Sequence, residues 1–222
     1  MAAVDRIGFL HTGAVVIDPV RSLFAQHVPT VTAVNYLDDR IVADLGDPDR
    51  HDSVRDRVIG LVETAKAAGI DTVMLTCSSI SEYAAEASAA TGVRVLRIDE
   101  AMADDAVAAG SRITVIATLP TTCAPTSRLI DERARLAGKE VQLTSIVVEG
   151  AFAAVAAGDR ATHDALVGAA IERAATQADV IVLAQASMAG AADAVSVSVP
   201  VLSSIAPGIR RLAALLADDA AR

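Results

Sequence analysis

Cys77 is the side chain in this sequence that is best placed to do chemistry. It directly follows the strand-like residues 73–76 (VMLT) and directly precedes two serines. Ser79 and Glu82 have the spacing of a capping box, which predicts a helix that begins directly after the cysteine. A thiol at a helix N-terminus lies at the positive end of the dipole, so it can ionise near neutral pH and act as a base or nucleophile. The alternative is a small buried apolar residue, the role of most free cysteines.

Polar residues that follow other apolar runs form a second set of candidates. His11 can act as a base or bind a carboxylate, since histidine titrates near neutral pH, or it can be a hydrogen-bonded loop residue. Asp38 and Asp39 can orient a substrate amine or act as a base, or they can cap a turn, and Glu149 has the same two interpretations. Hydroxyl groups can hold a carboxylate or cap a helix, and those in such positions are Thr12, Ser78, Ser79, Thr118, Thr121, Thr122, Ser187 and Ser204.

The remaining thiol and imidazoles have simpler interpretations. Cys123 lies five residues after Thr118, near an expected helix start, and a packed thiol is favoured over one that reaches a pocket. His27, His51 and His163 stand in polar stretches, so we expect them to be exposed to solvent.

These candidates are positioned by an alternation of short apolar runs and longer helical patterns. The runs are rich in Val and Ile and mostly apolar on both faces, which is typical of buried parallel strands. They cover residues 6–10, 31–36, 72–76, 93–97, 112–117, 141–148, 180–184 and 199–202. Helical spacing is found at residues 50–68, 82–90, 127–136 and 162–177. The alternation predicts an α/β fold with mainly parallel sheets covered by helices.

Three pairs of segments repeat at a nearly constant spacing. Residues 6–12 match 112–118, residues 71–80 match 179–188, and residues 93–96 match 199–202, at offsets of 106, 108 and 106 residues. We therefore predict two similar α/β halves, residues 1–105 and 106–222, with a C-terminal helix that can cross over to the first half. Ligands of such sheets bind beyond the carboxyl ends of the strands, so residues after each strand should face a cleft between the halves.

Composition and motifs exclude several classes of function. The chain has 222 residues, 53% of them hydrophobic and 21% charged, which is typical of a globular protein. A net charge of −9 without a Lys/Arg block, together with five aromatic residues, argues against a nucleic-acid partner. No glycine-rich nucleotide motif, serine-hydrolase elbow or metal-ligand spacing is present in the sequence.

The expected compartment follows from the cysteines and from the apolar runs. Two cysteines do not make a disulfide framework, and free thiols indicate a reducing compartment. No signal-peptide pattern and no membrane-length apolar run is present. We therefore expect a cytoplasmic protein without a membrane partner.

The order of the motifs resembles the aspartate/glutamate/hydantoin racemase superfamily. Residues 75–79 (LTCSS) resemble its first-lobe cysteine motif, and residues 181–188 (IVLAQASM) its second-lobe motif. Residues 113–122 resemble the hydroxyl-bearing loop that opens the second lobe, and residues 199–204 the closing strand. The resemblance spans almost the whole chain. It implies two α/β lobes related by a pseudo-twofold axis, with the active site in the cleft between them.

The resemblance also implies a reaction that needs no cofactor. In the family, one cysteine thiolate removes the proton α to a carboxylate and a second cysteine delivers a proton to the opposite face. It implies Cys77 as base or nucleophile, with Gln185 holding substrate charge at the second catalytic position. The substrate-binding candidates it implies are His11, Thr12, Asp38, Ser78, Ser79, Thr118, Thr121, Thr122, Ala186 and Ser187. The expected partners are a small-molecule carboxylate and further copies of the chain in a homo-oligomer.

Gln185 departs from the family pattern, because racemases have their second-lobe cysteine at this place. Glutamine donates hydrogen bonds but cannot abstract a proton. One thiol suits a reaction that needs a proton on one face only. Arylmalonate decarboxylases of the superfamily use a single cysteine in that way, on the opposite lobe, and maleate isomerases use a cysteine as nucleophile. A decarboxylase, a cis–trans isomerase and a non-catalytic small-acid binding protein are therefore the alternatives to a racemase.

Overall fold

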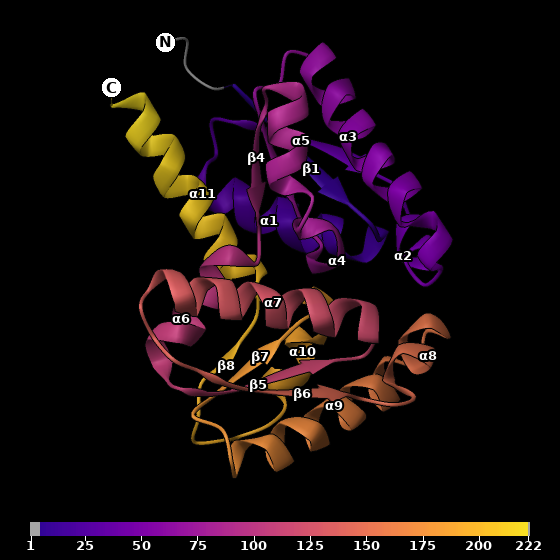
Figure 1. Ribbon diagram of the computed structural model, residues 1–222, viewed down its shortest axis with the longest axis vertical. Coiled ribbons are helices and arrows are strands. Elements are labelled where there is room, and N and C mark those ends of the chain that lie inside the picture. The colour runs from indigo at the N-terminus through magenta and orange to yellow at the C-terminus, as the bar shows by residue number, and fades with distance from the viewer. Residues whose placement is uncertain (1–4, 222) are drawn as a thin grey trace. The chain divides into compact units, whose positions relative to one another are not determined.

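The computed structural model describes residues 5–221. The prediction that the N-terminus has no signal-peptide pattern covers residues 1–4, and these residues lie outside this range. The chain divides into two compact units, which we call unit 1 (residues 1–99 and 205–222) and unit 2 (residues 100–204). Each unit contains one four-stranded sheet with helices packed on it (Figure 1). The predicted α/β fold with two similar parallel-sheet lobes is confirmed.

The sheet of unit 1 has the order β2-β1-β3-β4, and all neighbouring strands are parallel. Its strands are β1 (Arg6–His11), β2 (Thr32–Leu37), β3 (Thr72–Leu75) and β4 (Arg94–Arg97). All of β3 is buried, and so is all of β1 except its first residue. This burial on both faces explains why the two central strands are almost continuously apolar in sequence.

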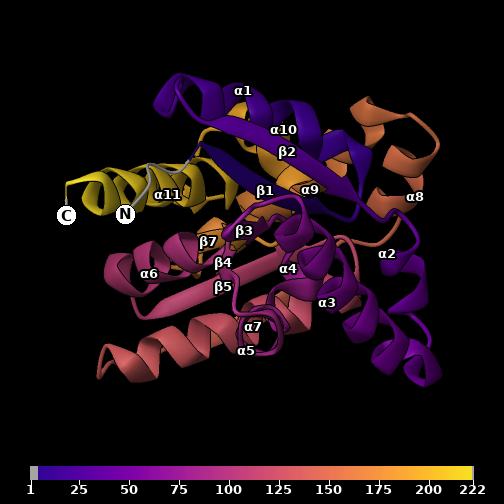
Figure 2. The ribbon, with the colours of Figure 1, turned by 90° about the horizontal axis from the view of Figure 1, so that it is seen from above.

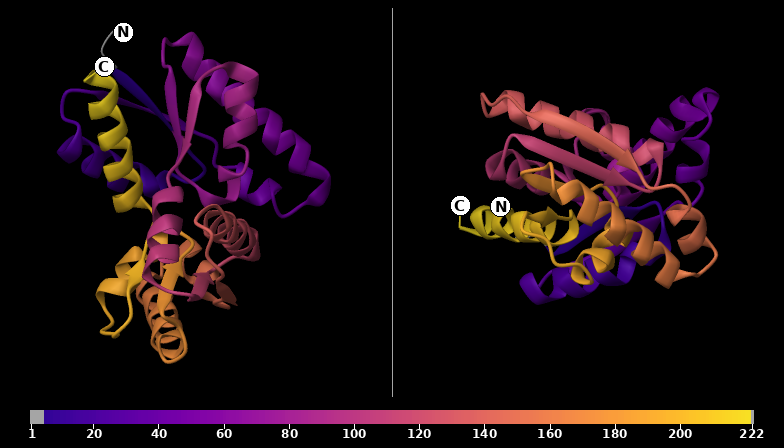
Figure 3. Two further views of the ribbon diagram at one scale, coloured as in Figure 1. Left: turned by 60° about the vertical axis from the view of Figure 1, so that its left-hand side comes forward. Right: turned by 90° about the horizontal axis from the view of Figure 1, so that it is seen from below.

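Helices cover both faces of this sheet (Figures 2 and 3). On one face, α1 (Ile17–His27) and α11 (Ile205–Ala220) pack against Phe9 and Met74. On the other face, α3 (His51–Ala67) and α5 (Ala84–Thr91) pack against Leu10 and Val73. Phe9 and Leu10 point to opposite faces because side chains alternate along a strand. The short helices of the unit are η1 (Ala14–Val16), α2 (Ile41–Asp44), η2 (Pro48–Arg50) and α4 (Ser78–Ser81).

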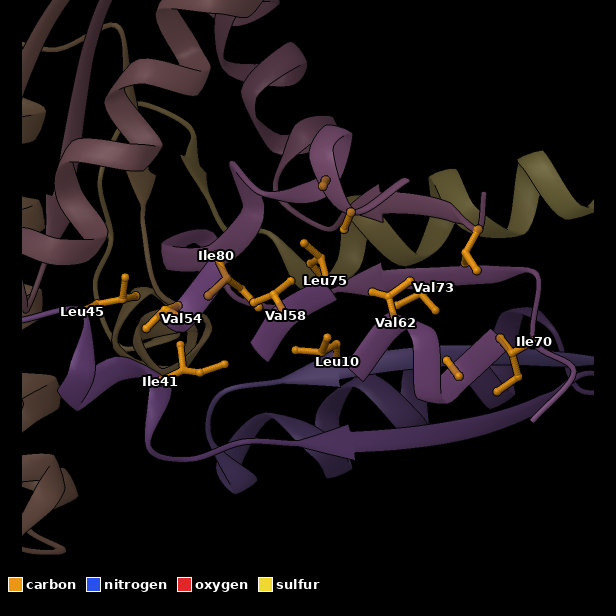
Figure 4. Close-up of a cluster of buried hydrophobic side chains, with 14 residues drawn as sticks. Leu10, Ile41, Leu45, Val54, Val58, Val62, Ile70, Val73, Leu75 and Ile80 are labelled. Atoms are coloured by element: carbon orange, nitrogen blue, oxygen red, sulfur yellow. The ribbon is translucent and has the colours of Figure 1, made fainter. Parts of the chain in front are cut away.

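The apolar spacing of α3 determines which side of this helix packs on the sheet. Val54, Val58 and Val62 recur every four residues, so they lie on one side of the helix and contact the strands around Leu10 (Figure 4). On the opposite face of the sheet, α11 approaches the end of β4 at Gly208. A Cβ atom there would overlap the carbonyl oxygen of Ile98, so only glycine permits this approach.

The sheet of unit 2 has the equivalent order, β6-β5-β7-β8, and is also fully parallel. Its strands are β5 (Arg112–Ala117), β6 (Gln142–Val147), β7 (Val180–Leu183) and β8 (Val201–Leu202). One face is covered by α6 (Glu100–Ala109) and α7 (Pro120–Leu136), the other by α9 (Arg160–Ala175) and α10 (Ala189–Asp193). The unit also contains α8 (Ala151–Ala156) and η3 (Ala186–Met188). The shared strand order agrees with the repeat in the sequence.

The predicted helix start directly after Cys77 is confirmed, because α4 begins at Ser78. Two local predictions are wrong. The capping box of Ser79 and Glu82 does not form, because Cys77 is the N-cap of α4 and Glu82 is its C-cap. The helix predicted at residues 127–136 begins at Pro120 instead. Proline is tolerated in the first turn of a helix because the first backbone N–H groups have no partner within the helix. None of the described helices is long and apolar enough to span a bilayer.

Candidate active site

The carboxyl ends of the central strands carry the main candidate residues in each unit. In unit 1, β1 ends at His11, and β3 is followed by Thr76 and Cys77. In unit 2, Thr118 directly follows β5, and Gln185 lies two residues after β7. β1 pairs with β3, and β5 pairs with β7. Because paired parallel strands end at the same edge, each unit brings its own candidates together there.

Cys77 is partly buried and is the N-cap of α4. Its backbone is extended, with φ −131° and ψ 124°. Its carbonyl oxygen accepts hydrogen bonds from the backbone N–H of Ile80 and from the hydroxyl of Ser81, each at 3.1 Å. Since α4 has only four residues, its dipole is small, and the expected help from a helix N-terminus is correspondingly weak. The predicted position of the thiol directly before a helix is confirmed, but this helix is too short to have a strong dipole.

His11 is fully buried at the end of β1 and is hydrogen-bonded at both ring nitrogens. Nδ1 lies 2.8 Å from the hydroxyl of Thr76, and Nε2 lies 2.9 Å from the side chain of Asn35. The Asn35 atom that faces Nε2 is the amide oxygen, which only accepts, so Nε2 donates its proton to Asn35. In the neutral imidazole Nδ1 is therefore the acceptor, and it faces the Thr76 hydroxyl, which also lies 2.9 Å from the carbonyl oxygen of Leu10.

Burial lowers the pKa of His11 below its usual value of 6.5, and the hydrogen bond to Asn35 opposes this shift in part. Desolvation penalises the imidazolium, so the folded protein favours the neutral ring. This arrangement agrees with the hydrogen-bonded interpretation of His11. It fixes the positions of the chain segments directly before Cys77, because Thr76 is the neighbour of the thiol in sequence.

Asp38, a predicted substrate-binding residue, has a strong partner within unit 1. Its Oδ2 accepts a hydrogen bond from Nε of Arg57 at 2.8 Å, and its Oδ1 accepts from Nη2 of the same guanidinium. Arg57 also donates to Asp44, at 2.6 Å. This contact lowers the pKa of Asp44, and the hydrogen bonds that Arg57 donates to Asp38 raise the pKa of Arg57. The carboxylate of Asp38 is thus neutralised by an arginine, as in a structural ion pair.

In unit 2, Thr118 and Gln185 form a hydrogen-bonded pair. The side-chain oxygen of Gln185 accepts from the backbone N–H of Thr118 at 2.6 Å and from its hydroxyl at 2.9 Å. Thr118 is buried and Gln185 is half-buried. Thr118 and Gln185 are distant in sequence and follow two neighbouring strands of the sheet, and their side chains are in direct contact.

The other candidates differ in exposure. The hydroxyl-bearing residues Thr12, Ser78, Ser79, Thr122 and Ser204 are buried, whereas Thr121, Ala186 and Ser187 are half-buried and Asp39 and Glu149 are exposed. Arg160, at the start of α9, donates to the carbonyl oxygen of Ser187 at 2.7 Å. This bond ties the loop after Gln185 to a helix of the same unit.

The burial of Cys123 and of two other histidines agrees with the sequence-based prediction, whereas that of a third histidine does not. Cys123 is buried in the core cluster of unit 2, so its interpretation as a packed thiol is confirmed. His27 and His51 are exposed. The prediction for His163 is wrong, because its side chain is fully buried. His163 lies four residues before the buried Val167 on α9, so it falls on the apolar side of the helix.

Three partners of the candidate residues were not identified from sequence. They are Asn35, which contacts His11, Arg57, which binds Asp38, and Arg160, which binds the loop of Ser187. Asn35 is an amide within a strand, but it is exposed on the edge strand β2, where water can satisfy a polar group, so its contact with His11 could not be inferred from the sequence. The two arginines have no sequence signal either, because charged residues on helices are usually solvated.

The hollows found within the single units lie away from most of these residues. One, of about 480 Å³, is lined by Arg112, Thr114, Gln142 and Thr144 at the amino ends of β5 and β6, with residues from the end of α9. The other, of about 690 Å³, runs along α3 and is bordered by Asp38. Neither contains Cys77 or Gln185 in its lining. The chemistry of the strand ends, and not these hollows, therefore identifies the candidate site.

The fold and the strand-end residues define a class of duplicated α/β proteins with a thiol after the third strand. The family model for Asp/Glu/hydantoin racemase matches residues 10–212. The chain therefore belongs to the Asp/Glu/hydantoin racemase family. Among curated proteins, none matches the sequence significantly.

Solved structures share the fold at low sequence identity. A protein described as a putative Asp/Glu racemase from Yersinia pestis has a TM-score of 0.74 and 17% identity, covering 96% of this chain and 100% of its own. Glutamate racemase from Bacillus anthracis has a TM-score of 0.78 and 17% identity, covering 98% and 83%. Arylmalonate decarboxylase has a TM-score of 0.57 and 19% identity, covering 96% and 93%.

Proposed function

We propose that this protein is an enzyme that transfers a proton at the carbon α to a carboxylate or carbonyl group of a small acid. It needs no cofactor, and Cys77 is its base or nucleophile. The observation that carries this proposal is the position of Cys77, which follows an inner strand of a sheet in a chain of the racemase family. Its thiol is only partly buried, whereas the other thiol, Cys123, is sealed in a core.

The proposed chemistry is a proton transfer without a change in oxidation state. The thiolate of Cys77 removes the proton from the α carbon, and the electron pair of that C–H bond moves onto the carboxylate. The resulting enediolate-like charge is stabilised by hydrogen-bond donors. Return of the proton from the Cys77 thiol restores the acid in the same configuration, whereas the opposite configuration needs a proton from a second donor on the other face, which Gln185 cannot supply.

Proton exchange in deuterated water, followed by NMR, tests this proposal. The substrates are amino acids, hydantoins, malonates and maleate, with wild type, Cys77→Ala and the thiol control Cys123→Ala side by side. We expect deuterium to enter the α position with wild type and Cys123→Ala, and not with Cys77→Ala. Equal exchange by Cys77→Ala and wild type would exclude the thiol as the base. Binding without exchange by wild type would favour a non-catalytic small-acid binding protein.

A decarboxylase is the second candidate, and Gln185 is the observation that favours it. A glutamine cannot deliver or remove a proton at the second face of the substrate, whereas decarboxylation with protonation needs one face only. In that reaction the C–C bond to one carboxylate breaks and carbon dioxide leaves. The electron pair stays on the α carbon, which takes a proton from Cys77. Release of carbon dioxide from malonates, absent in Cys77→Ala, would select this candidate over a racemase.

A further inference from the structure

We propose that unit 2 has a separate ligand site at the amino ends of its strands, and that this site binds the phosphate group of a small sugar phosphate. The site is the hollow of about 480 Å³ between β6 and the end of α9, which we call the β6 hollow. Thr118 and Gln185 follow β5 and β7 at the opposite ends of the strands. The inference is therefore independent of the proposed function.

The repeat within the chain provides a reference for the β6 hollow, because the same place in unit 1 is filled. Gly8 on β1 aligns with Thr114 on β5 in the repeat. A Cβ atom on Gly8 would lie 3.5 Å from the ring of Tyr36 and 3.5 Å from the side chain of Ile70. Both of these side chains pack in the apolar core on that face of the sheet. Unit 1 therefore closes this space with apolar atoms.

Unit 2 has smaller side chains at the corresponding positions. Ile146 takes the place of Tyr36 in the register of the edge strand. Ala178 stands two residues before β7, as Ile70 stands two residues before β3. The smaller side chains leave the space open, although the two sheets share the same strand order. The β6 hollow is thus a specific difference between the two halves of the chain.

Thr114 is the residue of the β6 hollow that argues most directly for a ligand. It lies on an inner strand and is only 5% exposed, and its hydroxyl has no hydrogen-bond partner within residues 5–221. Ile116, the next residue on the same face of β5, is fully buried and apolar. Because Thr114 lines the hollow, its hydroxyl can bond only to water or to a ligand that enters there.

The other polar residues of the β6 hollow supply hydrogen-bond donors from two sides. The strand side and the helix side together contribute Arg112, Gln142, Thr144, Arg173 and Gln177. None of the described residues that line the hollow is acidic.

Arg173 supplies the net positive charge of the β6 hollow. The Nε and Nη2 atoms of Arg112 donate to one oxygen of Asp179, at 3.0 and 2.6 Å, so this cation is neutralised. The guanidinium of Arg173 has neither an ion pair nor a hydrogen-bond partner in the part of the chain that the structure describes. It is therefore available to an anion.

A phosphate group fits this set of donors. Guanidinium groups bind phosphate oxygens through charge-assisted hydrogen bonds, and a tetrahedral phosphate can accept from the strand side and the helix side together. The hydroxyl and amide groups beside the cations suit the hydroxyl groups of a sugar. The volume of about 480 Å³ lies in the range of small-molecule sites, roughly 300–1,000 Å³, and exceeds the size of inorganic phosphate.

Isothermal titration calorimetry with ribose 5-phosphate tests the proposal, with ribose, inorganic phosphate and succinate as matched ligands. We expect ribose 5-phosphate to bind more tightly than each of these three. Arg173→Gln should weaken its binding by about 10-fold or more, because a charge-assisted hydrogen bond is lost. Arg135→Gln is the matched control and should bind like wild type, since Arg135 is an exposed arginine on α7 that pairs with Asp131. Thermal unfolding of each variant checks that it is folded.

A second pair of variants tests the space itself. Ile146→Tyr introduces the ring that closes the corresponding place in unit 1, so it should abolish binding without changing a charge. Ser145→Tyr adds the same ring at an exposed position on the opposite face of β6 and should leave binding unchanged. Thr114→Val keeps the shape of the side chain, removes the hydroxyl and should weaken binding while the protein stays folded.

Three results would overturn the inference. They are no binding of ribose 5-phosphate to wild type at millimolar concentrations, equal binding by Arg173→Gln and Arg135→Gln, and unchanged binding by a folded Ile146→Tyr. Tighter binding of ribose or succinate than of ribose 5-phosphate would overturn the assigned ligand class. Cys77→Ala should bind ribose 5-phosphate like wild type, so this result and the outcome of the exchange experiment are separate.

Discussion

The imidazole of His11 and the hydroxyl of Thr76 lie 2.8 Å apart and join the ends of β1 and β3 directly before Cys77. Thr76 is buried and also bonds to the carbonyl oxygen of Leu10 through both its hydroxyl and its backbone N–H. The side chain of Thr76 therefore connects the ends of β1 and β3 at the edge of the sheet that is next to Cys77. The contact makes the position of Cys77 dependent on a buried polar pair.

Thr76→Val should destabilise the protein. Valine has nearly the same shape but leaves the buried Nδ1 of His11 without its hydrogen-bond partner, which costs about 1–3 kcal/mol in the free energy of unfolding. Urea denaturation measures this loss. Thr64→Val is the control, because Thr64 is exposed on α3 and its hydroxyl bonds only within its own helix. A change no larger for Thr76→Val than for Thr64→Val would show that the pair with His11 contributes nothing.

His11 should make the protein less stable in mild acid. Burial lowers the pKa of His11 in the folded state below the value of 6.5, so the unfolded chain binds this proton more readily than the folded one. The free energy of unfolding should therefore fall as the pH drops below about 6.5. His11→Gln has no titrating ring and should show a smaller fall between about pH 7 and pH 5. Urea denaturation at several pH values gives both curves, and parallel curves would contradict the expectation.

Alkylation should distinguish the two thiols. Cys77 is partly exposed, whereas Cys123 is 4% exposed and packed in the core of unit 2. Iodoacetamide should therefore modify Cys77 first in the native protein, because reaction needs access to the sulfur. Peptide mass spectrometry at increasing times locates the adduct. Cys77→Ala should then show almost no early modification, and an early adduct on Cys123 would mean that its core opens readily.

The strands and the position of Cys77 could be predicted because they depend on local sequence. β5 (Arg112–Ala117) matches its predicted range, since a buried parallel strand is an uninterrupted apolar run. The contact of Thr118 with Gln185 could not be predicted in this way, because 67 residues separate them and only the pairing of β5 with β7 joins them. The pair of Asp38 with Arg57 depends on packing in the same manner. His163 was misjudged because its polar neighbours concealed the apolar side of α9.

Asp179 should titrate far below the ordinary range of an aspartate. Its carboxylate accepts from the guanidinium of Arg112 at 2.6 Å and from the backbone N–H groups of Ser111 and Arg112, and these bonds lower its pKa from 3.8 to about 2. The folded-state pKa is depressed, so the stability that this group contributes is present above pH 3.8 and is lost as the pH falls towards about 2.

Arg112→Met isolates the share of the guanidinium in this shift. The pKa of Asp179 should rise in the variant but stay below 3.8, because the two backbone donors remain and still favour the charged form. Carboxyl-carbon NMR titration reports the value directly. Arg135→Met, which removes an exposed arginine from α7, should leave the Asp179 titration unchanged. An unchanged Asp179 titration in Arg112→Met would assign the whole shift to the backbone of the loop before β5.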